Sequence, residues 1–151
     1  MIDTFPHMRR ALSLASAAAQ AGEVPVGAVV VRADGTVLAE AANRVETDHD
    51  PTAHAECRAI RAACARLGSA RLVDCDLFVT LEPCAMCAQA IAFARIRRLY
   101  YGADDPKGGG VAHGARIFDR ATTHHRPDIY GGIHDRAAAA LLRDFFRARR
   151  D

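Results

Sequence analysis

Hydrophobic residues follow two different periods along this chain, and the two periods separate predicted helices from predicted strands. Apolar residues at helical spacing, with many alanines, run through both ends of the sequence. Shorter runs rich in Val, Leu and Tyr are typical of buried strands. In chain order the pattern predicts helices over residues 5–21, 53–67, 83–94 and 134–150, one or two helical turns over 116–120, and strands over 24–31, 36–42, 75–80, 97–102 and 128–130.

The order of these elements predicts an α/β protein. Asp34-Gly35 joins the first two strands and supplies the positive φ angles that a hairpin turn needs. The later strands are separated by helices long enough for crossover connections, which predicts helices on both faces of a mixed sheet. Thr52 or Asp50 is expected to cap the second helix. The loop over 104–110 is expected to have little internal structure.

Composition and charge narrow the class of protein. The 151 residues contain neither a repeat nor a linker, which predicts a single domain over residues 1–151. The net charge of +2 does not by itself indicate nucleic acid, although a local basic patch remains compatible with it. Five cysteines without an apolar leader argue against a secreted disulfide framework, and no run has transmembrane length. We therefore predict a soluble, cytoplasmic protein with no membrane partner.

Two short motifs carry the candidate chemistry. Residues 50–56 (DPTAHAE) offer one imidazole and one carboxylate, and residues 80–87 (TLEPCAMC) offer two cysteines in a Cys-x-x-Cys spacing. Structural zinc sites use four protein ligands, whereas catalytic sites use three and keep the fourth position for water. Three nitrogen and sulfur ligands with a carboxylate beside the histidine favour a catalytic site. We predict that His54, Cys84 and Cys87 bind Zn²⁺.

Glu56 is the candidate catalytic residue. A carboxylate near a zinc-activated water would act first as a base and then as an acid. On an ideal helix, residues two positions apart point about 200° away from each other. His54 and Glu56 are therefore expected to work together only because both lie in the first turn, where side chains reach the helix tip.

Cysteines outside the predicted ligand set leave an alternative open. A Cys-x-x-Cys pair also occurs in structural zinc sites and in redox pairs. Cys57 follows His54 on the same predicted helix and would be the fourth ligand if this were a structural zinc protein or an RNA-binding module. In that case Glu56 would matter only for stability. We interpret Cys57, like Cys64 and Cys75, as a small apolar residue of the core.

The two motifs, with further segments, resemble the bacterial tRNA-specific adenosine deaminases of the cytidine deaminase-like superfamily, whose signature is His-x-Glu followed by Pro-Cys-x-x-Cys. The resemblance covers nearly the whole chain. It implies a three-layer α/β/α fold with a mixed five-stranded sheet, a Zn²⁺ cofactor and a homodimer. It also implies conversion of the wobble adenosine in a tRNA anticodon stem-loop to inosine. The further matching segments are residues 24–29, 43–44, 101–103 with Asp105 and Lys107 after them, and 141–147.

The resemblance also implies roles for individual residues. Asn43 would hydrogen-bond the purine or its sugar, the backbone of Ala55 would face the base, and Asp105 would lie in the loop that approaches the target nucleotide. Asn43 and Asp105 are also plausible as residues that shape a strand end and a turn. Phe145 and Phe146 are expected to pack in the core rather than to line a pocket.

Three features of this chain depart from the family pattern and concern the substrate. Asp104 stands where a basic residue is common, three glycines follow at 108–110, and the segment 112–133 differs. The alternative is therefore a deaminase of a free nucleobase or nucleoside, of the guanine, cytosine or adenosine type, on the same fold. A tRNA substrate requires an open pocket with basic residues around it, whereas a small substrate requires a closing lid. The candidate RNA contacts, which otherwise form solvated faces, are Arg95, Arg97, Arg98, Lys107, Arg126, Arg143, Arg147, Arg149 and Arg150.

Overall fold

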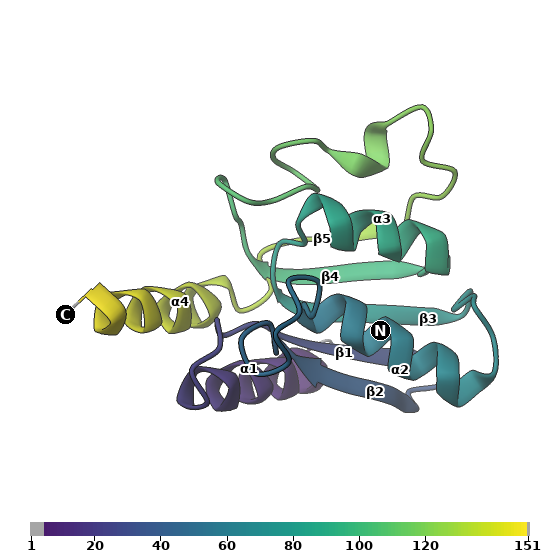
Figure 1. Ribbon diagram of the computed structural model, residues 1–151. Coiled ribbons are helices and arrows are strands. Elements are labelled where there is room, and N and C mark those ends of the chain that lie inside the picture. Colours follow the sequence, from purple (N-terminus) through teal and green to yellow (C-terminus); the bar gives the residue numbers. More distant parts are fainter. Residues whose placement is uncertain (1–4, 151) are drawn as a thin grey trace.

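The computed structural model describes residues 5–150, which fold around one five-stranded sheet (Figure 1). The strand order is β2-β1-β3-β4-β5. Strand β1 is antiparallel to β2 and β3, whereas β3, β4 and β5 are parallel to one another. The elements are α1 (Phe5–Gln20), β1 (Gly27–Arg32), β2 (Val37–Ala42), α2 (Ala55–Leu67), β3 (Cys75–Leu81), α3 (Ala85–Ala94), β4 (Arg98–Ala103), the short 3₁₀ helix η1 (Ile117–Asp119), β5 (Asp128–Tyr130) and α4 (Asp135–Arg150).

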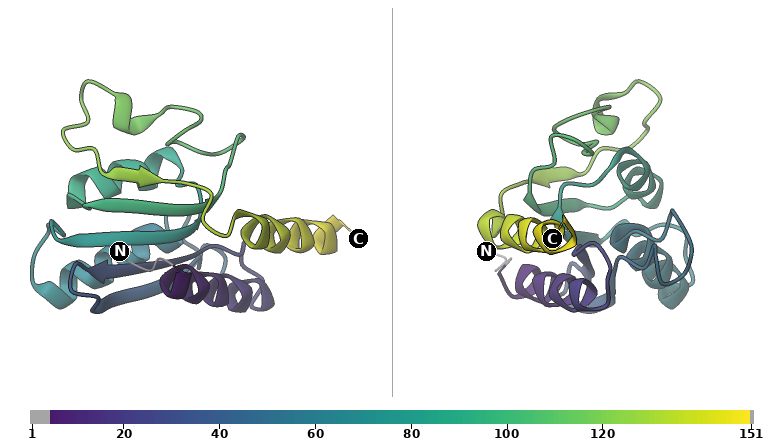
Figure 2. Two further views of the ribbon diagram at one scale, coloured as in Figure 1. Left: turned by 180° about the vertical axis from the view of Figure 1, so that it is seen from behind. Right: turned by 60° about the vertical axis from the view of Figure 1, so that its left-hand side comes forward.

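Helices cover both faces of the sheet (Figures 1 and 2). On one face Met8 and Ala11 of α1 pack against Val29, Phe78 and Tyr100. On the other face α2 and α3 pack against the alternate residues of the same strands. The predicted α/β class with a mixed, two-sided sheet is thus confirmed. No helix among residues 5–150 combines the length and hydropathy that a membrane span requires.

Three element boundaries differ from the predicted ones by two residues or more, each for a local reason. Strand β1 begins at Gly27 rather than at Val24, since Pro25 has no N–H to donate to a sheet. Helices α2 and α3 begin two residues later than predicted, because His54 and Cys84 keep an extended backbone with ψ of 149° and 174°. Two of the three candidate ligands, His54 and Cys84, therefore lie at helix N-caps.

Helix α4 occupies a different position from the other helices. It starts over the end of β4, where Gly102 leaves room for Ala138, and then extends past the end of the sheet alongside α1 (Figures 1 and 2). Near its end, Arg149 Nη2 donates a hydrogen bond of 2.8 Å to the carbonyl oxygen of Gly22. The end of α4 is thereby tied to the segment between α1 and β1.

Candidate active site and metal centre

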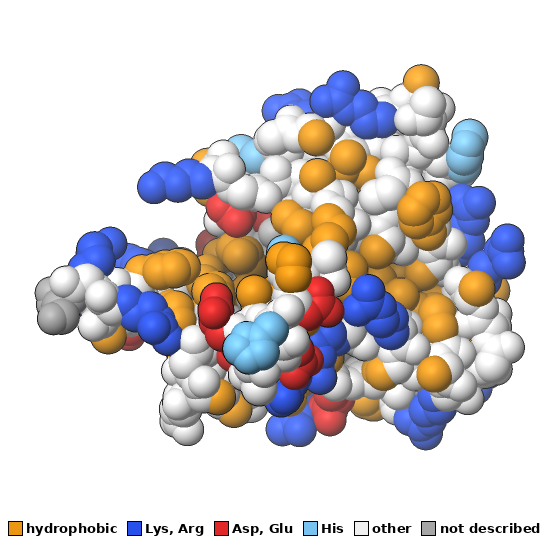
Figure 3. All heavy atoms as spheres, in the orientation of Figure 1, with side chains coloured by type: hydrophobic (Ala, Val, Ile, Leu, Met, Phe, Trp, Pro, Cys, Tyr) orange, Lys and Arg blue, Asp and Glu red, His pale blue; other side chains and the backbone are white. Residues whose placement is uncertain are grey.

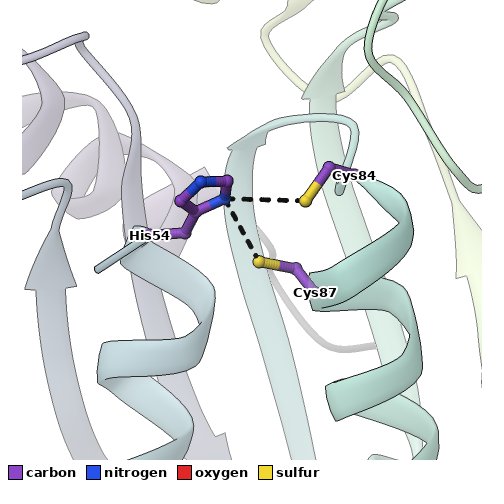
Figure 4. Close-up of side chains that lie close together, drawn as sticks. All are labelled: His54, Cys84 and Cys87. Carbon is purple, nitrogen blue, oxygen red and sulfur yellow. Dashed lines mark hydrogen bonds between the residues drawn. The ribbon is translucent and has the colours of Figure 1, made fainter. Parts of the chain in front are cut away.

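The starts of α2 and α3 bring the three predicted ligands together (Figure 4). Nδ1 of His54 lies 3.5 Å from Sγ of Cys84 and 3.5 Å from Sγ of Cys87, and the three atoms all lie within 4.8 Å of one another. Zinc bonds of about 2.3 Å to sulfur and 2.0 Å to nitrogen at a tetrahedral angle separate N from S by roughly 3.5 Å. The donor set and its spacing therefore fit Zn²⁺.

Proton positions in this cluster depend on the contacts among the three side chains. The contact with Cys84 raises the pKa of His54. Hydrogen bonds from Cys87 and His54 lower the pKa of Cys84 to about 4, although burial opposes this. Hydrogen bonds with Cys57 and Cys84, together with burial, raise the pKa of Cys87. An ion bound by the three atoms would take the place of the protons on His54 and Cys87.

Cys57 contacts the cluster without joining it. Its Sγ lies 3.6 Å from Sγ of Cys87, but it is not among the three residues whose ligand atoms lie within reach of one another. The side chain is buried, as is that of Cys75, whereas Cys64 is half-buried. Burial of Cys57 and Cys75 agrees with the interpretation of these thiols as small core residues.

Glu56 lies beside the cluster in a buried position. It follows the N-cap by two residues, and only 4% of it is exposed. The expected divergence of side chains two positions apart on a helix does not arise, because His54 precedes the helix with an extended backbone. Burial raises the pKa of Glu56 to about 7, with a contribution from negative charge on Cys84. A carboxyl group with this pKa can accept and return a proton near neutral pH.

A cavity of about 740 Å³ opens beside these residues. His54, Glu56 and Cys84 line it together with Asn43, and Figure 3 shows a hollow above α4 with hydrophobic side chains inside. The remaining lining residues come from the segment after α1, the loop after β2, the end of β3, the loop after β4 and the end of α4. They are Gly22, Glu23, Val24, Val26, Val45, Glu46, Leu81, Glu82, Asp105, Gly108, Phe145, Phe146 and Arg149.

The two phenylalanines of α4 form part of this cavity, so the expectation that they pack in the core is wrong. Phe146 is 44% exposed and Phe145 is half-buried. The guanidinium of Arg149 lies over the Phe145 ring, 4.2 Å from its centroid. The expectation failed because α4 extends past the end of the sheet, so its apolar side faces the cavity instead of a strand.

Asn43 links the loop after β2 to the start of α2. Its Oδ1 accepts a hydrogen bond of 2.8 Å from the backbone N–H of Ala55. The capping expected from Thr52 or Asp50 is absent from the described structure, where Asp50 instead accepts bonds from the N–H and hydroxyl of Thr52. Within residues 5–150 the Nδ2 group of Asn43 has no hydrogen-bond partner. The N–H of the buried Ala55 is already bonded, so its contact with a base stays a prediction.

Comparison with known proteins identifies the family. The sequence matches the MafB19-like deaminases over residues 2–150. The chain belongs to this family. A tRNA-specific adenosine deaminase of Agrobacterium fabrum is 55% identical to this deaminase over 150 residues, which cover 99% of this chain and 98% of the relative. The resemblance stated from the motifs is thereby confirmed.

Solved structures that are similar to this deaminase include proteins with different substrates. A structure from studies of A-to-I editing by tRNA:A34 deaminases has a TM-score of 0.89 and 54% identity, covering 91% of this chain and 99% of the other. A guanine deaminase from Nitrosomonas europaea has a TM-score of 0.83 and 25% identity, covering 96% of this chain and 85% of the other. Both share the α/β fold predicted here.

Two buried carboxylates of the deaminase were missed by the sequence analysis. Glu23 accepts hydrogen bonds from the N–H groups of Glu46 and Thr47 and from the Thr47 hydroxyl. Glu82 accepts bonds from the loop after β4. Burial opposes ionisation of each, but the hydrogen bonds outweigh it, so the pKa of each lies below 4.5. The signal in the sequence that could have identified them is an acidic residue close to a predicted buried strand.

The loop after β4 is more ordered than its composition predicted. Asp105 donates its N–H to Glu82 Oε1 at 3.0 Å and accepts the N–H of Gly108 on its own Oδ1 at 2.9 Å. Asp105 also lines the cavity. The expectation of little internal structure is therefore wrong, since the buried carboxylate of Glu82 organises the loop. Contact between Asp105 and a nucleotide stays a prediction.

Proposed function

We propose that this protein deaminates the wobble adenosine of a tRNA anticodon to inosine. The observation that carries the proposal is the full-length similarity to a tRNA-specific adenosine deaminase, at 55% identity over 99% of the chain. The buried Glu56 beside the His54, Cys84 and Cys87 cluster, at the side of a large cavity, supports the reaction class. Acting on tRNA, the enzyme would work in the cytoplasm.

The residues of the site suggest how the reaction would proceed. A zinc ion held by His54, Cys84 and Cys87 would make a water molecule acidic enough to act as a nucleophile near neutral pH. Glu56 would accept a proton from that water and deliver it to the ring nitrogen beside the attacked carbon. It would then take the remaining proton of the attacking oxygen and pass it to the departing amine. Water is consumed, ammonia leaves, and Glu56 returns to its starting state.

Other residues would hold the base in place. The Ala55 N–H fixes Oδ1 of Asn43, so the Nδ2 group would be oriented to donate to an acceptor on the purine or sugar. Val24, Phe145 and Phe146 give the cavity an apolar wall. A base taken out of an anticodon loop loses its stacking neighbours, and apolar and aromatic side chains would replace them.

The surface of α3 supports the homodimer. Nine of the ten residues of this helix are apolar, and a helix that is hydrophobic all round is normally buried. Yet Phe93 is 69% exposed and Met86 37% exposed, and hydrophobic side chains gather over α3 in Figure 3. We propose that a second copy of the chain covers this face.

A guanine deaminase activity is the second candidate, and the fold of the Nitrosomonas europaea enzyme favours it. It ranks lower because that enzyme shares 25% identity with this chain, against 54% for the tRNA:A34 deaminase structure. Both reactions would use the same metal ligands and Glu56, so the cluster does not distinguish them.

The deciding experiment measures inosine formation in an anticodon stem-loop with adenosine at the wobble position. Free adenosine, guanine and cytosine are assayed in parallel by ammonia release, and a stem-loop with adenosine at a neighbouring position serves as the matched substrate control. We expect inosine only at the wobble position. Ammonia from a free base without inosine in the stem-loop would overturn the proposal and favour the second candidate.

A further inference from the structure

The carboxylate of Glu82 is enclosed by hydrogen-bond donors from a single loop. The residue is 1% exposed. Its Oε1 accepts from the N–H of Asp105 at 3.0 Å and lies 2.7 Å from Nδ1 of His113. Its Oε2 accepts from the N–H groups of Val111, Ala112 and His113 at 3.1, 3.0 and 3.1 Å. Five donors thus converge on two oxygens, and four of them are backbone groups of residues 105–113.

An ionised carboxylate suits this position better than any neutral side chain. It only accepts hydrogen bonds, and bonds from N–H groups to an anion are stronger than neutral ones. A glutamine at position 82 would have the same shape, but its NH₂ group would face either the donors on Oε1 or those on Oε2. The hydrogen-bond donors around position 82 therefore favour a negatively charged side chain of the size of glutamate over a neutral one.

The run of three glycines lets the loop approach this carboxylate. A Cβ on Gly109 would lie 2.3 Å from Glu82 Oε2, and a Cβ on Gly110 would lie 2.5 Å from the backbone nitrogen of Ala85. The N–H of Gly110 also donates to the carbonyl oxygen of Pro83 at 2.8 Å. Gly109 and Gly110, two of the three glycines that depart from the expected sequence pattern, are thus the points where the loop backbone packs on Glu82 and on the start of α3.

The same loop forms one side of the cavity. Asp105 and Gly108 line it together with Glu82, and Gly108 is bonded to Asp105. Glu82 also lies only two positions before the candidate ligand Cys84 in the sequence. The carboxylate therefore connects the wall of the cavity with the segment that carries a metal ligand.

We propose that Glu82 is a positioning residue that fixes the 105–113 loop as a wall of the cavity and so determines how tightly the substrate binds. The identity of that substrate rests on the proposed function, whereas the hydrogen bonds by which Glu82 fixes the loop do not depend on it. Glu82 touches no reacting atom in this scheme; it acts through the loop backbone.

The test compares Glu82→Gln, Gly109→Ala and the double variant with wild type. Glu40→Gln is the matched control, since Glu40 is a partly exposed carboxylate bonded to Arg10 outside the cavity. Zinc content, KM and kcat are measured with whichever substrate the wild type deaminates. Backbone amide hydrogen exchange is followed at Val111, Ala112 and His113 in the absence of substrate.

We expect each single variant to raise KM by about tenfold or more while kcat changes by less than about threefold. Zinc stays stoichiometric, and the three amides lose protection. The double variant adds little to either single one, because both break the same contact. Glu40→Gln behaves as wild type.

Three results would overturn the proposal: unchanged protection of the three amides, a KM within twofold of wild type, or additive effects in the double variant. If Glu82→Gln does not fold, Gly109→Ala is judged by the same criteria with Glu82 intact. If the wild type forms no inosine in the stem-loop, the proposed tRNA substrate is rejected but the role of Glu82 is still tested. Amide exchange is measured without substrate, and KM is then measured with the free base that the wild type deaminates.

Discussion

The two sides of the cavity are built in different ways. The metal side comes from residues at the starts of two helices, each within a short sequence motif: His54 before α2, and Cys84 and Cys87 at the start of α3. The opposite side joins segments from both ends of the sequence, with Arg149 of α4 bonded to Gly22 after α1. The candidate metal ligands thus come from short sequence motifs, whereas the opposite wall of the cavity depends on tertiary packing.

This difference implies two kinds of response to mutation. In a three-ligand cluster each side chain supplies one of only three donor atoms, so loss of one member should abolish function. The opposite side spreads its contacts over several residues, so loss of one should weaken binding by degrees.

The largest effect is expected for Cys87→Ala on the metal side. Removing one of three ligands should reduce bound zinc to below about a tenth of an equivalent and destabilise the fold, because the free energy of metal binding also stabilises the folded state. Metal analysis and thermal unfolding measure both. Cys64→Ala, a half-buried cysteine outside the cluster, is the control and should retain zinc. Stoichiometric zinc in Cys87→Ala would contradict the ligand assignment.

Glu56→Gln should have the next largest effect. The amide keeps the shape of the side chain but cannot carry a proton between water and substrate, so kcat should fall about 10²- to 10⁴-fold. Zinc content and unfolding temperature should remain near those of wild type, which separates this variant from Cys87→Ala. A rate within tenfold of wild type would remove Glu56 from the proton-transfer role.

On the opposite side, Arg149→Ala should have a graded effect. It removes the hydrogen bond to Gly22 and the contact with the Phe145 ring, which together contribute about 1 to 2 kcal/mol. KM for the stem-loop should rise roughly 5- to 20-fold with kcat nearly unchanged. Arg150→Ala removes the same charge one residue later and should leave KM within about twofold. An equal rise in KM for the two variants would show that substrate binding depends on the net charge of this region and not on the contacts of Arg149.

The smallest effect concerns the pH dependence of stability. The pKa of Glu23 and that of Glu82 lie below the ordinary value of 4.5 in the folded protein. As pH falls, these carboxyl groups therefore bind protons in the unfolded chain before they do so in the folded protein. The stability that each carboxylate contributes is complete above pH 4.5 and is lost as pH falls below that value. Urea unfolding from pH 6 to pH 3 should show a shallower decline for Glu23→Gln than for wild type. If the unfolding free energies of Glu23→Gln and wild type decline in parallel as pH falls, Glu23 makes no such contribution to stability.

The same contrast explains how much the sequence could predict. The helices, the strands and the three candidate ligands were readable because each depends on periodicity or on spacing within a few residues. His54 and Glu56 were correctly placed near one helix tip, but the extended backbone of His54 that makes this possible was not foreseen. The strand order is consistent with the predicted hairpin and crossovers, because connection length limits how strands pair.

Contacts between segments that are far apart in the sequence could not be predicted from periodicity or local spacing. The apolar positions of Phe145 and Phe146 predict that they face something apolar, but not whether that is a strand or a cavity. Glu82 lies two positions before the Cys-x-x-Cys pair, yet its hydrogen-bond partners lie 23 to 31 positions further along the chain. Only the fold brings such donors to the carboxylate.

The bond between Arg149 and Gly22 spans 127 positions of the sequence, and this has a consequence for synthesis on the ribosome. All three candidate metal ligands have been made once translation passes Cys87, whereas the cavity wall cannot close until Arg149 has emerged. A nascent chain would therefore contain all three candidate ligands before it contains the residue that ties α4 to the rest of the cavity wall. A chain that stalls between these two points would contain every candidate ligand but would lack the bond that ties α4 to Gly22.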